Sequence, residues 1–317
     1  MMNKKFLGHI SNLDYGHIKR ELNKITEFSD LSSWKIKKLN IGEMEHTYLF
    51  SKGDKKYFVK EVKPHEAQVN YFLCSLKLNH LPYSIHPELL KKRILVMPYL
   101  KGKMLRKRKI DYNLLGDFIK FQNKMHNRIF FSKNNIMNLK NYSNKDEGFC
   151  IKNFNRDWNV GYKNIINLKK IYNLDIISKF IEIIDKINSE RDKIIKEFSQ
   201  MPFARQHHDF REDNILVTKK GQMLIDWGSS YGYGSFMYDY ADFLINDRKA
   251  LNLVVNESIF CKKVSKEKVK RWLYVSLIKK MFNMLCWYIP KGHRNIATKK
   301  RAKKMLEYEY KTYKVLK

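Results

Sequence analysis

The chain has 317 residues, 44% of them hydrophobic, so it is long enough to bury the core of one large domain or of two lobes. No apolar run approaches the length of a membrane span, and the first residues lack the apolar segment and cleavage site of a secretory signal. The four cysteines form no C-x-x-C pair, which argues against a disulfide framework and against a zinc site. We therefore expect a cytoplasmic protein.

The charge is strongly positive, with 63 Lys and Arg against 32 Asp and Glu, a net charge of +31. Residues 251–317 contribute 18 of the basic residues and only 4 acids, so the C-terminal part is especially basic. One interpretation is a general bias of the composition toward Lys, Asn and Ile. The other is a nucleic acid or an anionic surface as partner, which rests on charge alone because no RNA- or DNA-binding motif is present.

Signals for β-strands dominate the first hundred residues. Residues 34–42 and 46–62 are typical of extended segments, and the second contains a "KGD" turn that predicts a hairpin. A helix is predicted at residues 66–78, after Pro64, because apolar residues recur there at three- and four-residue steps. The run at 93–102, "RILVMPYLKG", predicts another strand that enters a turn.

Helical periodicity dominates the rest of the chain. Residues 113–127, 177–198 and 269–289 each predict one helix, because their apolar residues follow three- and four-residue steps. The predicted secondary structure therefore changes near residue 100, from a small part rich in strands to a larger helical part.

The stretch "ARQHHDFREDNILV", residues 204–217, combines histidines, acids and an asparagine with an apolar run. The following "NILVTKKGQMLIDW" predicts two strands joined by a turn, which would bring Asn214 and Asp226 opposite each other, roughly 5 Å apart at their Cα atoms. An amide oxygen and a carboxylate suit Mg²⁺. Asp209 would stand beside that metal as a proton acceptor for an attacking hydroxyl.

This arrangement resembles the aminoglycoside phosphotransferase and choline kinase family. The family pattern is H-x-D, four residues, N, and then a hairpin that ends in I-D-[FWY]. The resemblance implies an α+β, bilobal protein-kinase-like fold, with a small antiparallel-sheet N-terminal lobe and a larger, mainly helical C-terminal lobe. Residues 1–98 would be the ATP-binding lobe and residues 99–317 the catalytic and substrate lobe. Residues 128–200 and 250–317 contain no motif of the family.

The resemblance also implies roles for the residues of the motif. Asp209 would be the catalytic base, Asn214 and Asp226 the Mg²⁺ ligands, and His207 an organiser of the loop rather than a proton carrier. The segment "GYGSFMYDYADFLIN" resembles the part of the family that follows the metal aspartate, where Asp239 would brace the loop.

Position 211 departs from the usual pattern. The family usually has His there and protein kinases have Lys, whereas this chain has Arg211. A permanent guanidinium cation could meet the transferred phosphoryl group as a catalytic residue, and it could equally be a surface arginine.

The resemblance predicts a lysine on the third strand that pairs with a glutamate on the next helix. Lys60 shares a strand face with Phe58 and Val62, an unusual place for a cation without a partner. Glu66 falls on the apolar face of the helix predicted at 66–78, so the two could pair and present Lys60 to the ATP phosphates. The alternative for Glu66 is that it complements the helix dipole.

Other nucleotide-binding positions are less typical. The phosphate loop "LNIGEMEHTYLF" has only Gly42 where protein kinases have several glycines. Fewer glycines leave fewer backbone N–H groups able to approach a phosphate closely. By analogy, Met97 and Tyr99 would lie near the adenine, in the hinge between the lobes.

The leading interpretation is a phosphotransferase that uses ATP and Mg²⁺ to phosphorylate a hydroxyl of a small molecule. The basic C-terminal part makes a polycationic aminoglycoside a less favoured acceptor than a sugar, an amino alcohol or a glycan precursor, although a local acidic pocket could still exist. The alternative is a kinase-like spore-coat or assembly protein with little or no turnover.

Overall fold

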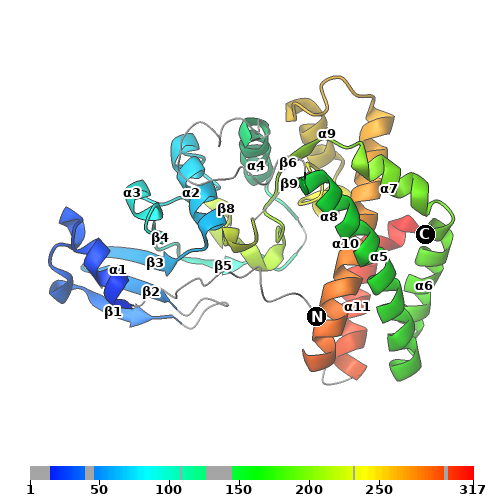
Figure 1. Cartoon of the computed structure of the whole chain (residues 1–317), viewed down its shortest axis with the longest axis horizontal. Coiled ribbons are helices and arrows are strands. Elements are labelled where there is room, and N and C mark those ends of the chain that lie inside the picture. Colours follow the sequence, from blue (N-terminus) through cyan, green and yellow to red (C-terminus); the bar gives the residue numbers. More distant parts are fainter. Residues whose placement is uncertain (1–14, 40–45, 108, 126–144, 231–232, 296–298) are drawn as a thin grey trace. The chain divides into compact units, whose positions relative to one another are not determined.

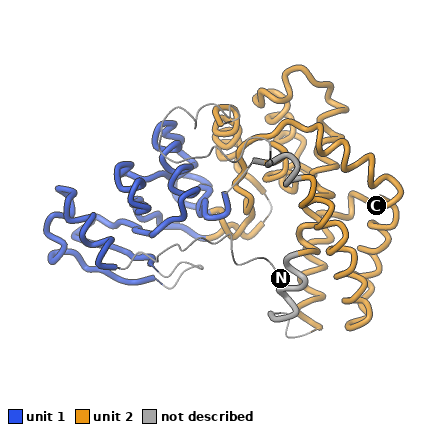
Figure 2. The backbone as a smooth tube through the Cα atoms, in the orientation of Figure 1, with its two compact units in different colours: residues 1–103, 216–230 blue, residues 104–215, 231–317 orange. Residues whose placement is uncertain are grey.

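The computed structural model describes residues 15–39, 46–107, 109–125, 145–230, 233–295 and 299–317 (Figure 1). The chain divides into two compact units (Figure 2). Unit 1 comprises Met1–Lys103 and Leu216–Ser230, and unit 2 comprises Met104–Ile215 and Tyr231–Lys317. Unit 1 is therefore discontinuous in the sequence, and whether the two units act as the ATP-binding and substrate lobes stays a prediction.

Four described strands of unit 1 form an antiparallel sheet in the order β1-β2-β3-β4. The predicted hairpin is confirmed, because β2 and β3 pair from Thr47↔Lys60 to Lys52↔Lys55 across a turn in which Gly53 has φ +55°. The strands are β1 Lys35–Lys38, β2 Thr47–Lys52, β3 Lys55–Glu61 and β4 Ile94–Pro98.

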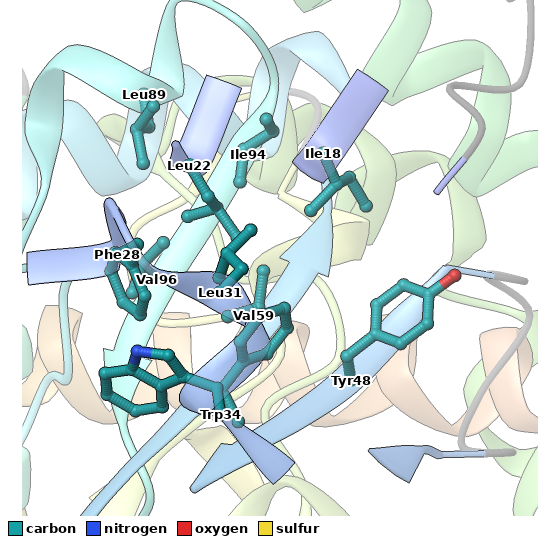
Figure 3. Packing of buried hydrophobic residues seen from close by; sticks show 11 residues of the cluster. Ile18, Leu22, Phe28, Leu31, Trp34, Tyr48, Val59, Leu89, Ile94 and Val96 are labelled. Atoms are coloured by element: carbon teal, nitrogen blue, oxygen red, sulfur yellow. The ribbon is translucent and has the colours of Figure 1, made fainter. Parts of the chain in front are cut away.

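An aromatic cluster covers one face of this sheet (Figure 3). Phe28 and Trp34 lie 5.1 Å apart at their ring centroids and pack with Val59 and Val96 of the strands. The covering segments are the helix α1 Tyr15–Leu22 and the 3-10 helices η2 Thr26–Phe28 and η3 Leu31–Ser33. Burial of these large rings against the strands stabilises unit 1.

The helix α2, Pro64–Leu76, covers the opposite face of the sheet, where Ala67 packs with Val62 and Leu95 (Figure 1). It begins two residues before the predicted start because Pro64 occupies its first turn, where a missing N–H costs nothing. It ends at Leu76, and the next residue, Lys77, has left-handed backbone angles and donates its N–H to Leu73 O. A short helix, α3 Pro87–Leu90, precedes β4.

A second sheet, in the order β5-β7-β8, contains the predicted hairpin after Asn214. Its strands are β5 Gly102–Met104, β7 Ile215–Thr218 and β8 Gly221–Leu224. A Cβ atom on Gly102 would come within 2.5 Å of Val217 O, so only glycine fits this crossing. The second strand of the hairpin, β8, ends at Leu224 rather than at the predicted Asp226. Asp226 has φ +60° and is the N-cap residue of the 3-10 helix η6 Trp227–Ser229.

Unit 2 is mainly helical. Its longest described helices are α5 Lys145–Tyr172 and α10 Lys266–Asn295, which run side by side (Figure 1) and stack Trp158 on Phe282 at 4.2 Å between ring centroids. A short sheet pairs β6 with β9. The remaining elements are α4 Tyr112–Met125, α6 Asp175–Asn188, α7 Arg191–Ser199, β6 Phe203–Arg205, η5 Glu212–Asn214, β9 Tyr233–Ser235, α8 Ala241–Leu244, α9 Arg248–Glu257, α11 Lys299–Tyr313 and η7 Lys314–Leu316.

The prediction of one helix over residues 177–198 is wrong, because the structure divides this segment into α6 and α7. Ile187 is the last buried apolar residue of α6, and Ile194 is the first of α7. The residues between them are polar, so a continuous helix would gain little burial over almost two turns. The helices predicted at 113–127 and 269–289 correspond to α4 and α10.

In the part of the chain that the structure describes, no helix combines the length and the apolar character needed to cross a membrane. Three cysteines whose side chains are described, Cys74, Cys261 and Cys286, are free thiols. Burial raises the pKa of each of these thiols to about 11.

Candidate active site

The first group of functional residues lies in unit 1 around Lys60. Successive side chains on β3 point to opposite faces, and Lys60 lies on the face covered by α2. Its Nζ atom donates hydrogen bonds to Glu66 Oε1 and to Asp226 Oδ1, each at 3.0 Å. The pairing of Lys60 with Glu66 that the sequence predicted is therefore present, and Asp226 is a second partner.

This lysine is held charged in a largely buried place. Burial of Lys60 disfavours its charged form, but the attraction of Glu66 and Asp226 outweighs burial and raises the pKa of Lys60. Burial also raises the pKa of Glu66, whose side chain is only 2% exposed, against the opposing attraction of Lys60. The cluster thus holds a cation at a fixed point, as recognition of phosphate requires.

The turn that carries Asp226 is tied to α2 within the same unit. His65 Nε2 lies 2.8 Å from Gly228 O, and Gly228 N donates to Asp226 Oδ1 at 3.4 Å. A Cβ atom on Gly228 would lie 3.2 Å from Asp226 Oδ1 and 3.6 Å from Glu66 Oε2. Sequence reasoning missed His65, because nothing in the local pattern distinguishes it from a solvated histidine at the start of a helix.

The second group lies in unit 2 on the loop between β6 and η5. Asp239 Oδ2 accepts a hydrogen bond from His207 N at 2.6 Å, and its Oδ1 accepts one from His208 N at 2.9 Å. His207 is fully buried, and His208 has φ +64°. Asp239 therefore holds the backbone of the loop in an unusual conformation, as its predicted bracing role requires.

The environment of Asp239 changes its ionisation. Burial raises the pKa of this carboxyl to about 7, although the N–H groups of His207 and His208 and the nearby Lys280 favour the charged form. Lys280 Nζ donates to Asp239 O at 2.8 Å and also hydrogen-bonds Asp242. Helix α10 thereby supports the loop through Lys280.

Asp209 itself has two oriented neighbours. Asn214 Nδ2 donates to Asp209 Oδ2 and to Asp209 O, each at 2.8 Å. Arg211 forms an ion pair with Asp209, with 3.0 Å between Nε and Oδ1. Since its amide nitrogen is used by Asp209, the group that Asn214 can offer to a metal is its amide oxygen. Asp209 is thus a carboxylate held in one orientation and still 29% exposed, as a general base must be.

A cavity of about 410 Å³ opens beside this carboxylate. All of the described residues that line it belong to unit 2, including Asp209 and Arg211 from the loop and Asp239 from the segment after β9. Helix α10 contributes Lys280, and α11 contributes Tyr308, whose hydroxyl donates to Glu212 Oε1 at 2.6 Å. The walls from α10 and α11 were missed, because residues 250–317 contain no recognisable motif.

Met97 and Tyr99, which were predicted to lie near the adenine, are on β4 or directly after it. Met97 lies half-buried on β4, where it pairs with Phe58, and Tyr99 is 45% exposed just after this strand. Gly42 lies outside the described residues. Asn214 belongs to unit 2 and Asp226 to unit 1, so their predicted approach stays a prediction.

Comparisons with known proteins address the fold and the family. A search of curated protein sequences gives no match. Among solved structures, the choline kinase from Cryptosporidium parvum Iowa II is 13% identical, with 96% of each chain covered and a TM-score of 0.57. A mutant of aminoglycoside 2'-phosphotransferase-IIIa in complex with GDP is 12% identical, with 95% of this chain and 98% of that chain covered and a TM-score of 0.53.

The AMP-bound complex of spectinomycin phosphotransferase is 13% identical, with 83% of this chain and 86% of that chain covered and a TM-score of 0.51. At these identities the likenesses show the fold, and they confirm the predicted α+β, protein-kinase-like fold. The model of the phosphotransferase enzyme family (APH) matches residues 35–257, which is more than half of the chain. The chain therefore belongs to the phosphotransferase enzyme family, as the motif of Asp209, Asn214 and Asp226 predicted.

Proposed function

We propose that this phosphotransferase moves the γ-phosphoryl group of ATP to a hydroxyl group of a small molecule. The proposal rests on the environment of Asp209. Its Oδ2 atom accepts a hydrogen bond from Asn214 Nδ2 at 2.8 Å, and the residue lines the cavity of unit 2. A general base needs this combination of fixed orientation and access to the acceptor.

The cluster around Lys60 supports ATP as the donor. A lysine held by Glu66 at 3.0 Å presents a positive charge at a fixed place, where it would bind phosphate oxygens of the nucleotide. Met97 and Tyr99 would lie near the adenine, as the resemblance implies.

We propose Asn214 and Asp226 as the residues that hold Mg²⁺. The described residues contain no group of three or more His, Cys, Asp or Glu that could form a metal site of their own. Magnesium suits a site with only two protein ligands, an amide oxygen and a carboxylate oxygen, because it takes its other ligands from phosphates and water. When bound, it would neutralise charge on the transferred phosphoryl group.

In this mechanism Asp209 accepts the proton of the acceptor hydroxyl as the hydroxyl oxygen bonds to the γ-phosphorus. The bond from that phosphorus to the bridging oxygen breaks, and ADP leaves with the electron pair. Arg211, on the same loop as Asp209, would stabilise charge on the phosphoryl group as it moves.

The test is Mg²⁺-dependent formation of ADP by the wild type and by Asp209→Asn, with a panel of sugars, amino alcohols and aminoglycosides as acceptors. We expect acceptor-stimulated turnover to fall by about 10²- to 10⁴-fold in the variant, the range typical of a lost general base. Binding of ADP should be unchanged.

Undiminished turnover by Asp209→Asn would refute the mechanism. Binding of ATP by the wild type without turnover on any acceptor would favour the alternative of an assembly protein. Two further predictions remain separate from this test: a cytoplasmic location, and binding of nucleic acid or another polyanion through charge, which should weaken steeply with added salt.

A further inference from the structure

The turn that carries Asp226 has an anchor that the proposed mechanism does not use. His65, in the first turn of α2, lies with its Nε2 atom 2.8 Å from Gly228 O. A carbonyl oxygen only accepts hydrogen bonds, so Nε2 carries the hydrogen and donates it. Both residues belong to unit 1, although they are 163 positions apart in the sequence. The contact therefore joins the two segments of the chain that make up unit 1.

Asp226 needs such an anchor, because burial does not fix its position. Its side chain is 53% exposed, whereas the side chain of Glu66 in the same charge cluster is 2% exposed. The backbone of Asp226 has φ +60° and ψ 72°, in the left-handed region that residues with a side chain rarely adopt. An exposed residue in a strained conformation keeps its place only when its surroundings hold it there.

Two contacts of the Asp226 carboxylate are poorly suited to hold the turn while a nucleotide is bound. Lys60 Nζ donates to Asp226 Oδ1 at 3.0 Å, but in the proposed function Lys60 binds phosphates and Asp226 binds Mg²⁺. Gly228 N donates to the same Oδ1 atom at 3.4 Å, which is long for a hydrogen bond. The contact of His65 uses a backbone carbonyl, so it can persist while the carboxylate and the lysine engage a ligand.

The turn lies close against the charge cluster, so a small displacement of the turn would change the cluster. A Cβ atom on Gly228 would lie only 3.9 Å from Lys60 Nζ and 3.6 Å from Glu66 Oε2. The lack of a side chain at this position allows the close approach. Because His65 holds the carbonyl of this same glycine, a loss of the contact would let the turn move and would change the distance from the Asp226 carboxylate to Lys60.

One turn of α2 thus contacts both parts of the cluster. Glu66 accepts a hydrogen bond from Lys60 Nζ at 3.0 Å, and the adjacent residue, His65, holds the turn of Asp226. The helix itself does not require a histidine here, because the first turn of a helix favours acidic side chains and Glu66 already supplies one. The contact with Gly228 is what accounts for the imidazole.

We propose that His65 is a positioning residue for the nucleotide and magnesium site. Its N–H holds the turn in the conformation in which the Asp226 carboxylate faces Lys60, and the response of nucleotide binding to Mg²⁺ depends on this contact. The inference rests on the proposed function for the role of Asp226 as a Mg²⁺ ligand. It deepens that function by adding a residue that acts through the turn rather than through contact with the nucleotide.

The test measures the affinity of the full chain for ADP by calorimetric titration, once in EDTA and once at saturating Mg²⁺. The ratio of the two dissociation constants is the magnesium response of a variant. His65→Leu removes the donor and should reduce the magnesium response by about three- to tenfold, the factor expected for one lost hydrogen bond. The affinity for ADP in EDTA should stay within about twofold of the wild type, because Lys60 keeps Glu66 as its partner.

Two polar variants that differ by one methylene group test whether the donor itself matters. His65→Gln places an amide N–H at nearly the distance of Nε2 from the backbone, so it can donate to Gly228 O and should retain a magnesium response within about twofold of the wild type. His65→Asn is too short to reach the carbonyl and should lose as much of the response as His65→Leu. Since both variants are polar, the comparison does not depend on how the turn tolerates leucine.

The matched control is His86→Leu, which makes the same substitution at another histidine of unit 1. The ring nitrogens of His86 face Glu27 and Glu88 rather than the turn of Asp226. The control should lower the free energy of unfolding in urea, while its magnesium response stays within about twofold of the wild type, since distant sites act independently. A general loss of stability is thereby separated from a loss of positioning.

An unchanged magnesium response in His65→Leu and His65→Asn would overturn the inference. So would a loss in His65→Gln or in His86→Leu as large as that in His65→Leu. Failure of the proposed metal site gives a different result, because the wild type itself would then bind ADP equally well in EDTA and in Mg²⁺. A wild type that responds to Mg²⁺ together with variants that respond equally would refute only the role of His65.

Discussion

The two groups of charged residues achieve their positions in different ways. Lys60 and Glu66 lie on a strand and a helix of unit 1, and they hold each other through a largely buried ion pair. Asp209 lies on a loop of unit 2, and its position depends on the backbone that Asp239 braces. A charge on regular secondary structure is thus held by its ionic partner, whereas a charge on a loop is held by the hydrogen bonds that fix the backbone of the loop.

The largest effect on stability is expected from Lys60→Met, because it leaves Glu66 buried without its cation. The unfolding free energy should fall by about 3–5 kcal/mol, less whatever protonation of Glu66 recovers, as measured by urea unfolding. Affinity for ADP should fall as well.

The control for this variant is Lys60→Met combined with Glu66→Leu. The double variant should recover most of the lost stability without recovering ADP affinity. If ADP affinity returns together with stability, Lys60 serves the fold and not the nucleotide.

Asp239→Ala tests how the backbone of the loop fixes the position of Asp209. It removes the acceptor of two loop N–H groups, those of His207 and His208, at a cost of about 1–3 kcal/mol for each group left unsatisfied. Turnover should fall while ADP affinity stays, in contrast to Lys60→Met. A parallel loss of ADP affinity would mean that the loop and the nucleotide cluster are not separable.

The ionisation of Asp239 gives a pH dependence with a defined sign. Its folded pKa of about 7 lies above the usual value, so its contribution to stability is present at acidic pH and is lost as pH rises through 7. The stability of the wild type relative to Asp239→Asn should therefore decrease between pH 5 and pH 8, as measured by urea unfolding at each pH. A constant difference would show that Asp239 is ionised in the folded protein throughout this pH range.

The smallest effect is expected at Arg211, whose side chain is 37% exposed. Arg211→Gln should lower turnover by about tenfold or less if Arg211 meets the phosphoryl group, and Arg211→Lys should retain part of it. Unchanged turnover in both variants would identify Arg211 as a surface arginine that only accompanies Asp209.

The resemblance to the family implied both groups, and local patterns supported it. Lys60 lies on an apolar face of its strand, an unusual place for a cation, and Asp209 and Asn214 match the H-x-D, four residues, N pattern that precedes the hairpin. The break between α6 and α7 was missed because apolar residues follow a helical period on both sides of it, while the residues between Ile187 and Ile194 are all polar.

The cavity could not be predicted, since Glu309 and Glu212 lie almost a hundred residues apart in the sequence. Only the packing of α11 in unit 2 brings them to one cavity. Local patterns carry no information about such a contact.

Because unit 1 is discontinuous in the sequence, its two segments are synthesised on the ribosome at different times. Lys60 and Asp226 are 166 residues apart, so the lysine emerges long before its second carboxylate partner. At about 5–20 residues per second, roughly 6–25 s separate the synthesis of Lys103 from that of Ser230. During that interval Lys60 has Glu66 but not yet Asp226 as a partner, and a fragment that ends at Lys103 would lack this second partner altogether.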